Sequence, residues 1–222
     1  MLKITNDRLS AIRAIGVIVF VLLKHIIHLN YMNVQFLIPI SNKHSENEQK
    51  ALSVLDKGCK WLRIAKTEAS DDEVRPVIER LLKACKAHKA TLVIDDRPNL
   101  AKVVEADGVH LSDGKNIAET RQLIGEELII GATLSEFDAI VQAKSQGADY
   151  IDCGPYPGID ALGLKNLMVR LYEADCALPI SAYGHIVPND VPAIAQTGVR
   201  AITTSDETFF EKDIFTIIHK FS

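Results

Sequence analysis

The chain has 222 residues, of which 47% are hydrophobic and 24% are charged, and its formal net charge is −4 at pH 7. This composition excludes an intrinsically disordered chain, and the length suits one large domain better than two small ones. Lys and Arg form no cluster and no stripe with interleaved aromatic residues, so we expect no nucleic-acid partner.

The first part of the chain differs from the rest. Residues 14–29 contain an apolar core of only nine residues, Ile15–Leu23, which ends at Lys24. A bilayer-spanning helix needs about 20 apolar residues, so we expect no transmembrane span and no membrane partner. The following NYMNVQF offers no cleavage site for a signal peptide. We interpret residues 1–31 as an apolar extension ahead of a natural start at Met32, with a membrane-associating amphipathic segment as the alternative.

From Met32 onward, short apolar runs alternate with helical patterns. The runs are mostly continuous, which is typical of parallel strands that are buried on both faces. The predicted strands are Val34–Ile40, Trp61–Ile64, Thr91–Ile94, Gly108–Leu111, Leu128–Ala132, Tyr150–Cys153, Pro179–Ala182 and Ala201–Thr204.

The segments between these strands carry helical signals. The clearest is SDDEVRPVIERLLKACKAHK, in which Ser70 and Glu73 form a capping-box pattern ahead of one apolar face. In a second segment Ser135 is the predicted N-cap, and Gly147 ends the helix. Helical patterns are predicted over residues 70–89, 100–104, 135–147, 162–175 and 190–198.

Eight strands with helices between them predict a single-domain (βα)8 TIM barrel over residues 32–222. The about 190 residues after Met32 lie near the lower limit for this fold, so its loops must be short. A doubly wound open sheet is the rival fold. It would need a glycine fingerprint after the first strand, and IPISNKHSENE has none.

In a barrel, functional side chains come from the C-terminal ends of the strands and the loops that follow them. Strand three ends in the acidic pair Asp95 and Asp96, followed by Arg97. Such a pair suits Mg²⁺, which is held by a few carboxylates together with substrate phosphates. Pairing with Arg97, or capping of the short helix that follows, is the alternative.

Other strand ends supply further candidates. His110 ends strand four, Thr133 ends strand five, and the turn CGPYPG after strand six contributes Gly154 and Tyr156 as substrate-binding candidates. The turns after strands seven and eight are where barrels commonly bind phosphate through backbone N–H groups. These two turns contain Gly184, His185, Thr204 and Ser205.

The cysteines carry no motif. Cys59, Cys85, Cys153 and Cys176 form no CxxC pair and no zinc-ligand spacing with histidine. We expect buried, reduced thiols in a cytoplasmic protein, with Cys153 inert on its apolar strand.

Four segments resemble the thiamine phosphate synthase family, which includes thiazole tautomerase relatives: GCKWLRIAK, VIDDRPNLAKVVEADGVHLSDGK, IIGATLSEFDAIVQAKSQGADYIDCGP and LPISAYGHI with IAQTGV. The resemblance runs from about Met32 to the C-terminus and also implies a (βα)8 barrel. It implies joining of hydroxymethylpyrimidine diphosphate to a thiazole phosphate, with Mg²⁺ and with release of diphosphate. A homodimer would be ordinary for such a barrel.

The resemblance assigns roles to several of the candidates. Asp96 falls on the family's metal-binding Asp, and Asp95 on the substrate-binding Asn before it. Thr133 falls on the catalytic hydroxyl of strand five. Gly184 with His185 falls on a phosphate turn, and the backbone near Thr204 and Ser205 on a second phosphate contact.

The chain also departs from the family pattern. The strand-two motif Gln-x-Arg-x-Lys reads Arg63, Ala65 and Thr67, so two phosphate-binding cations are missing, and Lys66 would point to the other face of an ideal strand. The second metal-binding Asp aligns with Lys115, and only a shifted loop would let Asp113 replace it.

The Thr-x-Thr-Lys motif is also missing, because GPYPGIDALGL is too short for it. Each lost donor costs about a hundredfold or more in rate, so the sequence predicts weak or absent synthase activity. Arg63, as a catalytic cation, and Lys115, as a substrate-binding cation, would still attract an anionic small molecule.

Two other functions stay open. One is a catalytically silent barrel that binds a thiamine precursor, another phosphorylated small molecule or a protein partner. The other is an isomerase acting on the thiazole phosphate, with His110 or His185 as the general acid–base. The family's isomerase histidine follows strand five, where ATLSEF has none.

Overall fold

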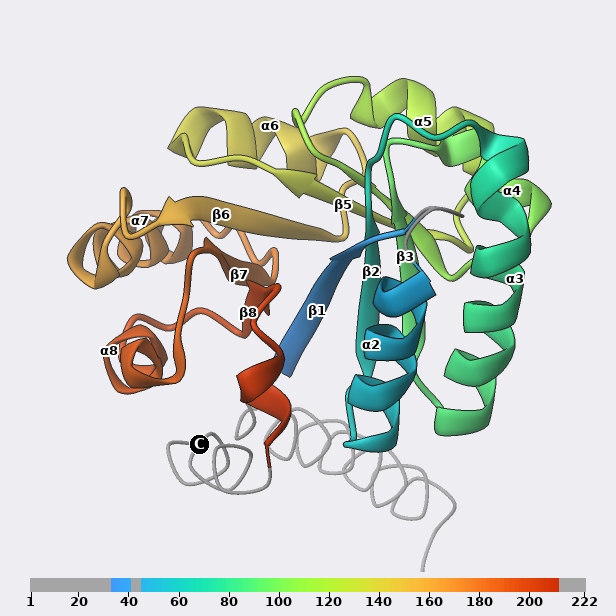
Figure 1. Cartoon of the computed structure of the whole chain (residues 1–222). Coiled ribbons are helices and arrows are strands. Elements are labelled where there is room, and N and C mark those ends of the chain that lie inside the picture. Colours follow the sequence, from blue (N-terminus) through green and yellow to red (C-terminus); the bar gives the residue numbers. More distant parts are fainter. Residues whose placement is uncertain (1–32, 41–44, 212–222) are drawn as a thin grey trace, which may run out of the picture. The chain divides into compact units, whose positions relative to one another are not determined.

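The computed structural model describes residues 33–40 and 45–211, which belong to a compact unit spanning Met32–Phe221. Eight parallel strands close into a barrel in the sequential order β1 to β8, and helices surround it (Figure 1). Each strand pairs with the next one along the chain, and β1 pairs with β8. The predicted (βα)8 barrel is confirmed.

The elements follow the order expected from the sequence. The strands are β1 (Asn33–Pro39), β2 (Trp61–Ala65), β3 (Thr91–Asp95), β4 (Gly108–Leu111), β5 (Ile129–Thr133), β6 (Tyr150–Tyr156), β7 (Ile180–Gly184) and β8 (Ala201–Thr204). The helices are α2 (Ser45–Asp56), α3 (Asp71–His88), α4 (Pro98–Val103), α5 (Ile117–Ile124), α6 (Phe137–Ser145), α7 (Ala161–Glu173) and α8 (Val191–Ala195), with 3₁₀ turns η1 (Pro188–Asp190) and η2 (Glu207–Phe210). Each predicted strand overlaps an observed one.

The helix signals of the sequence are confirmed for α3. The Ser70 hydroxyl accepts from the Glu73 N–H at 3.4 Å, and the Glu73 carboxylate accepts from the Ser70 N–H at 2.8 Å, which completes the capping box. The apolar face from Val74 to Cys85 is buried against the barrel. Lys89, in a left-handed conformation, ends the helix.

The predicted N-cap of α6 is wrong. Glu136, not Ser135, precedes the helix, and no side chain caps it. The reason is that the chain is still bound to the barrel at Leu134, whose N–H donates to the Asp152 carbonyl at 3.0 Å. The other end is as predicted, because Gly147 has a φ of 97° directly after the helix.

The barrel interior is polar at its centre. Gln35, Arg63, Asp95, His110, Asp152, Ser181 and Thr203 come from seven different strands, and each is at most 4% exposed. Most residues on either side of them along the strands, such as Leu62 and Ile64, are apolar and join the core, whereas Asp96 and Thr204 are polar. Barrels of this fold commonly fill their interior with branched apolar side chains, so this chain has built a hydrogen-bonded network there instead.

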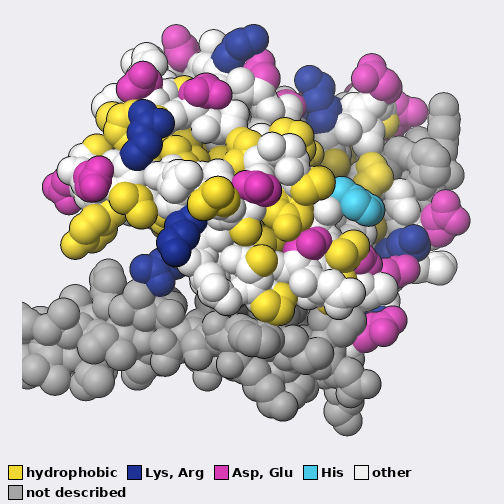
Figure 2. Space-filling view, turned by 90° about the vertical axis from the view of Figure 1, so that its left-hand side faces the viewer, with side chains coloured by type: hydrophobic (Ala, Val, Ile, Leu, Met, Phe, Trp, Pro, Cys, Tyr) yellow, Lys and Arg dark blue, Asp and Glu magenta, His cyan; other side chains and the backbone are white. Residues whose placement is uncertain are grey.

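Exposed apolar side chains gather on α7. Leu162, Val169 and Tyr172 are 66%, 50% and 86% exposed. Figure 2 faces the side where α7 and α8 lie in Figure 1, and hydrophobic side chains form a patch there between charged ones. The homodimer that the family resemblance implies stays a prediction.

Within the described ranges, no helix combines the length and the hydropathy that crossing a bilayer requires. The apolar segment 14–29 lies outside the described residues, so our interpretation of residues 1–31 stays a prediction.

Replacing the capping residue tests the local stability of α3. We expect Ser70→Ala to lower the free energy of unfolding by about 1 kcal/mol, because the Glu73 N–H loses its acceptor. Ser53→Ala, at an exposed interior position of α2, is the matched control and should leave the stability within about 0.5 kcal/mol. Urea denaturation measures both, and equal effects would contradict the role of the cap.

Candidate active site

A buried charge cluster crosses the barrel below the strand ends. Arg63 on β2 binds Asp95 on β3 with two of its three guanidinium nitrogens, Nε to Oδ1 at 2.6 Å and Nη2 to Oδ2 at 3.0 Å. Its remaining arm, Nη1, binds the Asp152 carboxylate on β6. The side chains of Arg63, Asp95 and Asp152 are 2%, 5% and 0% exposed. Arg63 and Asp95, predicted as catalytic and substrate-binding residues, therefore bind each other and are closed off from solvent.

Asp152 is a central residue that the sequence analysis missed. Besides Arg63, it accepts a hydrogen bond from the Thr203 hydroxyl at 3.0 Å. The signal was present in the strand YIDCGP, where a lone carboxylate interrupts an apolar run. A charged side chain on a strand that is buried on both faces requires a charged partner, and Arg63 on the equally apolar β2 is its complement.

Burial dominates the electrostatics of this cluster. It raises the pKa of Asp95 to about 6, although the Arg63 guanidinium lowers it. Burial also raises the pKa of Asp152, again against Arg63. The cluster has two carboxyl groups for one guanidinium, so the second carboxylate must ionise without a cation of its own.

A chain of hydrogen bonds links the interior to the end of β5. His110 Nδ1 lies 2.8 Å from the Tyr150 hydroxyl, and His110 Nε2 lies 2.8 Å from the Thr133 hydroxyl. Burial and the nearby Arg63 charge lower the pKa of His110 well below its usual value, so the ring is neutral at physiological pH. With both nitrogens engaged and no exposed surface, His110 does not face a ligand as an isomerase acid–base would.

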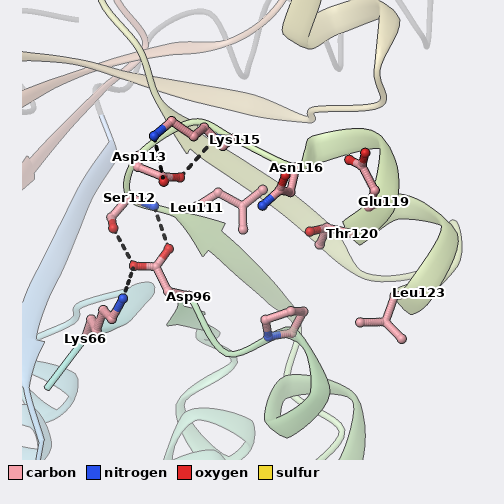
Figure 3. Close-up of a pocket in the computed structure, with 11 residues that line it drawn as sticks. Lys66, Asp96, Leu111, Ser112, Asp113, Lys115, Asn116, Glu119, Thr120 and Leu123 are labelled. Carbon is pink, nitrogen blue, oxygen red and sulfur yellow. Dashed lines mark hydrogen bonds and ion pairs between the residues drawn. The ribbon is translucent and has the colours of Figure 1, made fainter. Parts of the chain in front are cut away.

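A pocket opens at the strand ends, outside the buried cluster. Its volume is about 390 Å³, and loops after β2, β3 and β4 line it together with α5. Figure 3 shows Lys66, Asp96 and Ser112 on one side and Asp113 with Lys115 above them. The pocket thus brings together the two predicted metal ligands, the predicted substrate cation Lys115, and Lys66.

Asp96 is held in place by Ser112. The Ser112 N–H donates to Asp96 Oδ1 at 2.8 Å, and the Ser112 hydroxyl donates to Oδ2. Lys66 Nζ lies 3.8 Å from the same Oδ2. On the other side, Asp113 accepts from the Lys115 N–H at 3.0 Å, and its second oxygen lies 3.6 Å from Lys115 Nζ.

Two sequence-based predictions at this pocket are wrong. Lys66 does not point away from the site, because β2 ends at Ala65 and the alternation of an ideal strand no longer applies. Arg97 pairs with neither carboxylate of the acidic pair but with Asp71. Nor does the pair cap α4, whose first turn carries no side-chain cap.

The donor set of the pocket fits Mg²⁺ only in company with a ligand. Across the described residues, no three His, Cys, Asp or Glu side chains gather in a way that would hold a metal ion. Mg²⁺ is, however, usually held by one or two carboxylates together with phosphate oxygens and waters. Asp96 and Asp113 supply such a partial set, and the two lysines beside them suit the phosphates.

The turn after β7 is engaged with β6. β6 extends to Tyr156, three residues beyond its predicted end, and the His185 N–H donates to the Tyr156 carbonyl at 3.0 Å. A Cβ on Gly184 would lie 2.4 Å from Tyr156 N, and one on Gly154 would lie 2.0 Å from the Tyr183 carbonyl oxygen. Close backbone approach therefore explains both glycines, and the predicted phosphate-binding amide of His185 already has an acceptor.

The end of β8 is divided between a buried and an exposed residue. Thr204 is 3% exposed. Its hydroxyl donates to the Ile186 carbonyl at 3.3 Å and accepts from the Asp206 N–H at 3.1 Å. Ser205 is exposed beyond it. Of this predicted pair, Ser205 is the one whose side chain faces solvent.

The prediction that the four cysteines are free and buried is confirmed, whereas the cytoplasmic location stays a prediction. All four thiols are free and buried, and burial raises the pKa of Cys153 to about 11. The thiol is therefore neutral at physiological pH and unreactive as a nucleophile.

The pKa of Asp95 has a consequence for stability. Folding raises this pKa from 3.8 to about 6, so the folded chain binds the proton more tightly than the unfolded chain. The free energy of unfolding should then fall as the pH rises from about 4 to about 6, and Asp95→Asn should flatten this fall. Urea denaturation across this range measures it, with the exposed Asp138→Asn as control, and an unchanged slope in Asp95→Asn would refute the assignment.

Removing the buried cation Arg63 should destabilise the chain far more than breaking an exposed ion pair. Arg63→Met leaves Asp95 and Asp152 buried without a partner, so we expect it to destabilise the chain by about 3–5 kcal/mol. Arg80→Met, which breaks an exposed ion pair with Glu48, should lower the stability far less. Chemical denaturation of the two variants compares them directly, and similar losses would contradict a structural role for Arg63.

Comparison with known proteins identifies the family. The family described as thiamine monophosphate synthase matches residues 36–207. A thiamine-phosphate synthase of Bacteroides fragilis is 37% identical over 187 residues, which cover 78% of this chain and 90% of the relative. The thiamine-phosphate synthase of Phocaeicola vulgatus is 35% identical over 195 residues, covering 82% and 92%.

A solved structure agrees at the level of the fold. The thiamine phosphate pyrophosphorylase from Pyrococcus furiosus superposes with a TM-score of 0.73 at 22% identity, over 86% of this chain and 98% of that one. The match of the family to residues 36–207, which include every strand end described above, decides the assignment. This chain belongs to the thiamine monophosphate synthase family.

Proposed function

We propose that the protein is a thiamine phosphate synthase, which joins hydroxymethylpyrimidine diphosphate to a thiazole phosphate and releases diphosphate. The observation that carries this proposal is the position of Lys66 beside Asp96 at the pocket mouth. The chain lacks the two strand-two cations of the family pattern, and Lys66 supplies a cation from the loop that follows the same strand.

The charges of the pocket suit a departing diphosphate. The leaving group carries several negative charges, and catalysis of its departure requires cations where that charge develops. The Lys66 and Lys115 side chains are 62% and 74% exposed, and each lies more than 3.5 Å from its carboxylate. Such long, solvated ion pairs are weak, so both lysines are free to turn toward phosphate oxygens.

We propose Mg²⁺ as the cofactor, held by Asp96 and Asp113 together with diphosphate oxygens. When bound, the ion supplies charge neutralisation to the leaving group. Ser112 orients Asp96 through its N–H and hydroxyl, which leaves the remaining lone pairs of the carboxylate directed into the pocket. Within the loop after β4, the Lys115 N–H donates to Asp113.

The buried cluster of Arg63, Asp95 and Asp152 suits the pyrimidine end of the substrate rather than its diphosphate end. Asp95 lies beside His110 in the β3–β4 register, and His110 contacts Thr133. An excess of carboxyl groups below Thr133 repels phosphate and stabilises the positive charge that develops on the pyrimidine as diphosphate leaves. The pyrimidine accordingly belongs over Thr133, and the diphosphate at the Lys66 and Lys115 rim.

Two further expectations accompany this function. The missing family residues predict a slow enzyme, and a catalytically silent binding protein is the extreme of that prediction. The four free thiols suit a reducing compartment, so we place the activity in the cytoplasm.

Calorimetric titration with hydroxymethylpyrimidine diphosphate, with and without Mg²⁺, together with an assay of thiamine phosphate formation, tests the proposal. We expect Mg²⁺-dependent binding that Asp96→Ala abolishes, and that Lys66→Ala weakens by about tenfold through loss of one charge-assisted contact. Lys165→Ala, on the exposed side of α7, is the matched control and should bind like the unchanged chain.

The outcomes separate the candidate functions. Binding and turnover support the synthase, and a low rate confirms the prediction from the missing residues. Binding without turnover at high protein concentration identifies a silent barrel. Absence of any Mg²⁺-dependent binding overturns the proposed site.

A further inference from the structure

Three side chains form a chain of hydrogen bonds from the start of β6 to the end of β5. Tyr150, at the start of β6, is 5% exposed, His110 on β4 is fully buried, and Thr133 ends β5 with a half-buried side chain. Both hydrogen bonds of the chain, from Tyr150 to His110 and from His110 to Thr133, are 2.8 Å long.

The position of Tyr150 is fixed by its surroundings. A Cβ on Gly131 would lie 2.1 Å from the Tyr150 ring, so only glycine at this position of β5 leaves room for it. The Trp61 ring packs against Tyr150 edge to face, with 5.4 Å between the centroids. The phenol is therefore held in one orientation toward His110, which is typical of a group that positions another.

The direction of the hydrogen bonds follows from the number of protons. A neutral imidazole has one N–H and one acceptor nitrogen, and a phenol has one proton to donate. Within the described part of the chain, His110 Nδ1 is the only hydrogen-bond partner of the Tyr150 hydroxyl. If Nδ1 carried the proton, the Tyr150 O–H would be buried without an acceptor, which is unfavourable.

Tyr150 therefore donates to Nδ1, and the ring proton is on Nε2. The Nε2–H then donates to the Thr133 oxygen, so the proton of Thr133 must point to another acceptor. Among the described residues, the Thr133 hydroxyl has no hydrogen-bond partner besides His110.

We propose that Tyr150 and His110 are positioning residues that direct the proton of the Thr133 hydroxyl to a hydrogen-bond acceptor on the bound ligand. Because the proposed function places the pyrimidine over Thr133, the ligand atom that Thr133 recognises is an unprotonated ring nitrogen. A ligand without an acceptor at this point would leave the Thr133 proton unpaired and would bind more weakly. The identity of the ligand as a pyrimidine diphosphate rests on the proposed function, whereas the direction of the hydrogen bonds does not.

The neutral state of His110 supports this arrangement. Its pKa is lowered by burial and by the Arg63 charge, so the ring does not gain a second proton at physiological pH. Successive hydrogen bonds in one direction polarise each other, which strengthens Thr133 as a donor.

Nitrogen-15 NMR of the unchanged chain tests the direction without any substitution. The chain has seven histidines, so His110→Gln identifies the resonances of His110. We expect the Nε2–H tautomer, and we expect Tyr150→Phe to move both nitrogen shifts toward the average of the two tautomers. An Nδ1–H tautomer or a charged ring in the unchanged chain would overturn the proposal, as would shifts that Tyr150→Phe leaves unaltered.

A kinetic cycle tests the consequence for Thr133. Thr133→Val should lower kcat by about a hundredfold and Thr133→Ser by much less, since serine keeps the hydroxyl. Tyr150→Phe should lower kcat by about tenfold or less in the unchanged chain, the scale of one hydrogen bond, and should have no effect in Thr133→Val. Tyr172→Phe, on the exposed face of α7, is the matched control.

The NMR measurement and the kinetic cycle distinguish failure of the inference from failure of the proposed function. Independent, multiplying effects of Tyr150→Phe and Thr133→Val would show that Tyr150 does not act through Thr133, and would overturn the inference. Absence of turnover in the unchanged chain would contradict the proposed function alone, because the tautomer of His110 is read without substrate.

Discussion

The requirement to neutralise charge inside a closed barrel governs this structure. Arg63 reaches from β2 to Asp95 on β3 and across to Asp152 on β6, and none of the three side chains is more than 5% exposed. A buried ion is stable only when its partners are complete, so each of these residues depends on the other two. The same hydrogen-bonded network continues through Thr203 on β8 to Gln35 on β1, so it links β1, β2, β3, β6 and β8.

This cluster decides where ligand chemistry takes place. Because Arg63 is fully engaged with the two carboxylates, it offers no charge to an anion at the barrel centre. The two cations that line the described pocket, Lys66 and Lys115, are on loops that follow β2 and β4, beside Asp96 and Asp113 (Figure 3). The barrel centre instead presents the Thr133 hydroxyl, oriented from below by His110. The division into a charged rim and a hydrogen-bonding centre matches a substrate with a diphosphate at one end and a ring at the other.

The departures from the family pattern are partly compensated within this chain. Arg63, which stands where the family pattern has Gln, is paired with the Asp152 carboxylate inside the barrel. Lys66 returns a cation to the site from one position beyond the motif, since the strand ends before it. The loop after β6, which is too short for the family's Thr-x-Thr-Lys, lies against the turn after β7 through the Tyr156 carbonyl and the His185 amide. That contact joins the ends of β6 and β7, and the pocket lies on the side of β3 and β4.

The sequence by itself determined the barrel and most local structure. Continuous apolar runs located all eight strands, and the Ser70–Glu73 pattern located the start of α3, because strand burial and helix capping depend on residues a few positions apart. The acidic pair, Thr133 and Lys115 were correctly placed at strand ends for the same reason.

Only the tertiary structure decided their partners. Arg63 and Asp152 are 89 residues apart, and nothing local relates them. The direction of Lys66 depended on where β2 stops, and the pairing of Arg97 with Asp71 on the arrangement of two loops. Such contacts are set by strand register and barrel closure, which bring together side chains that no short-range pattern connects.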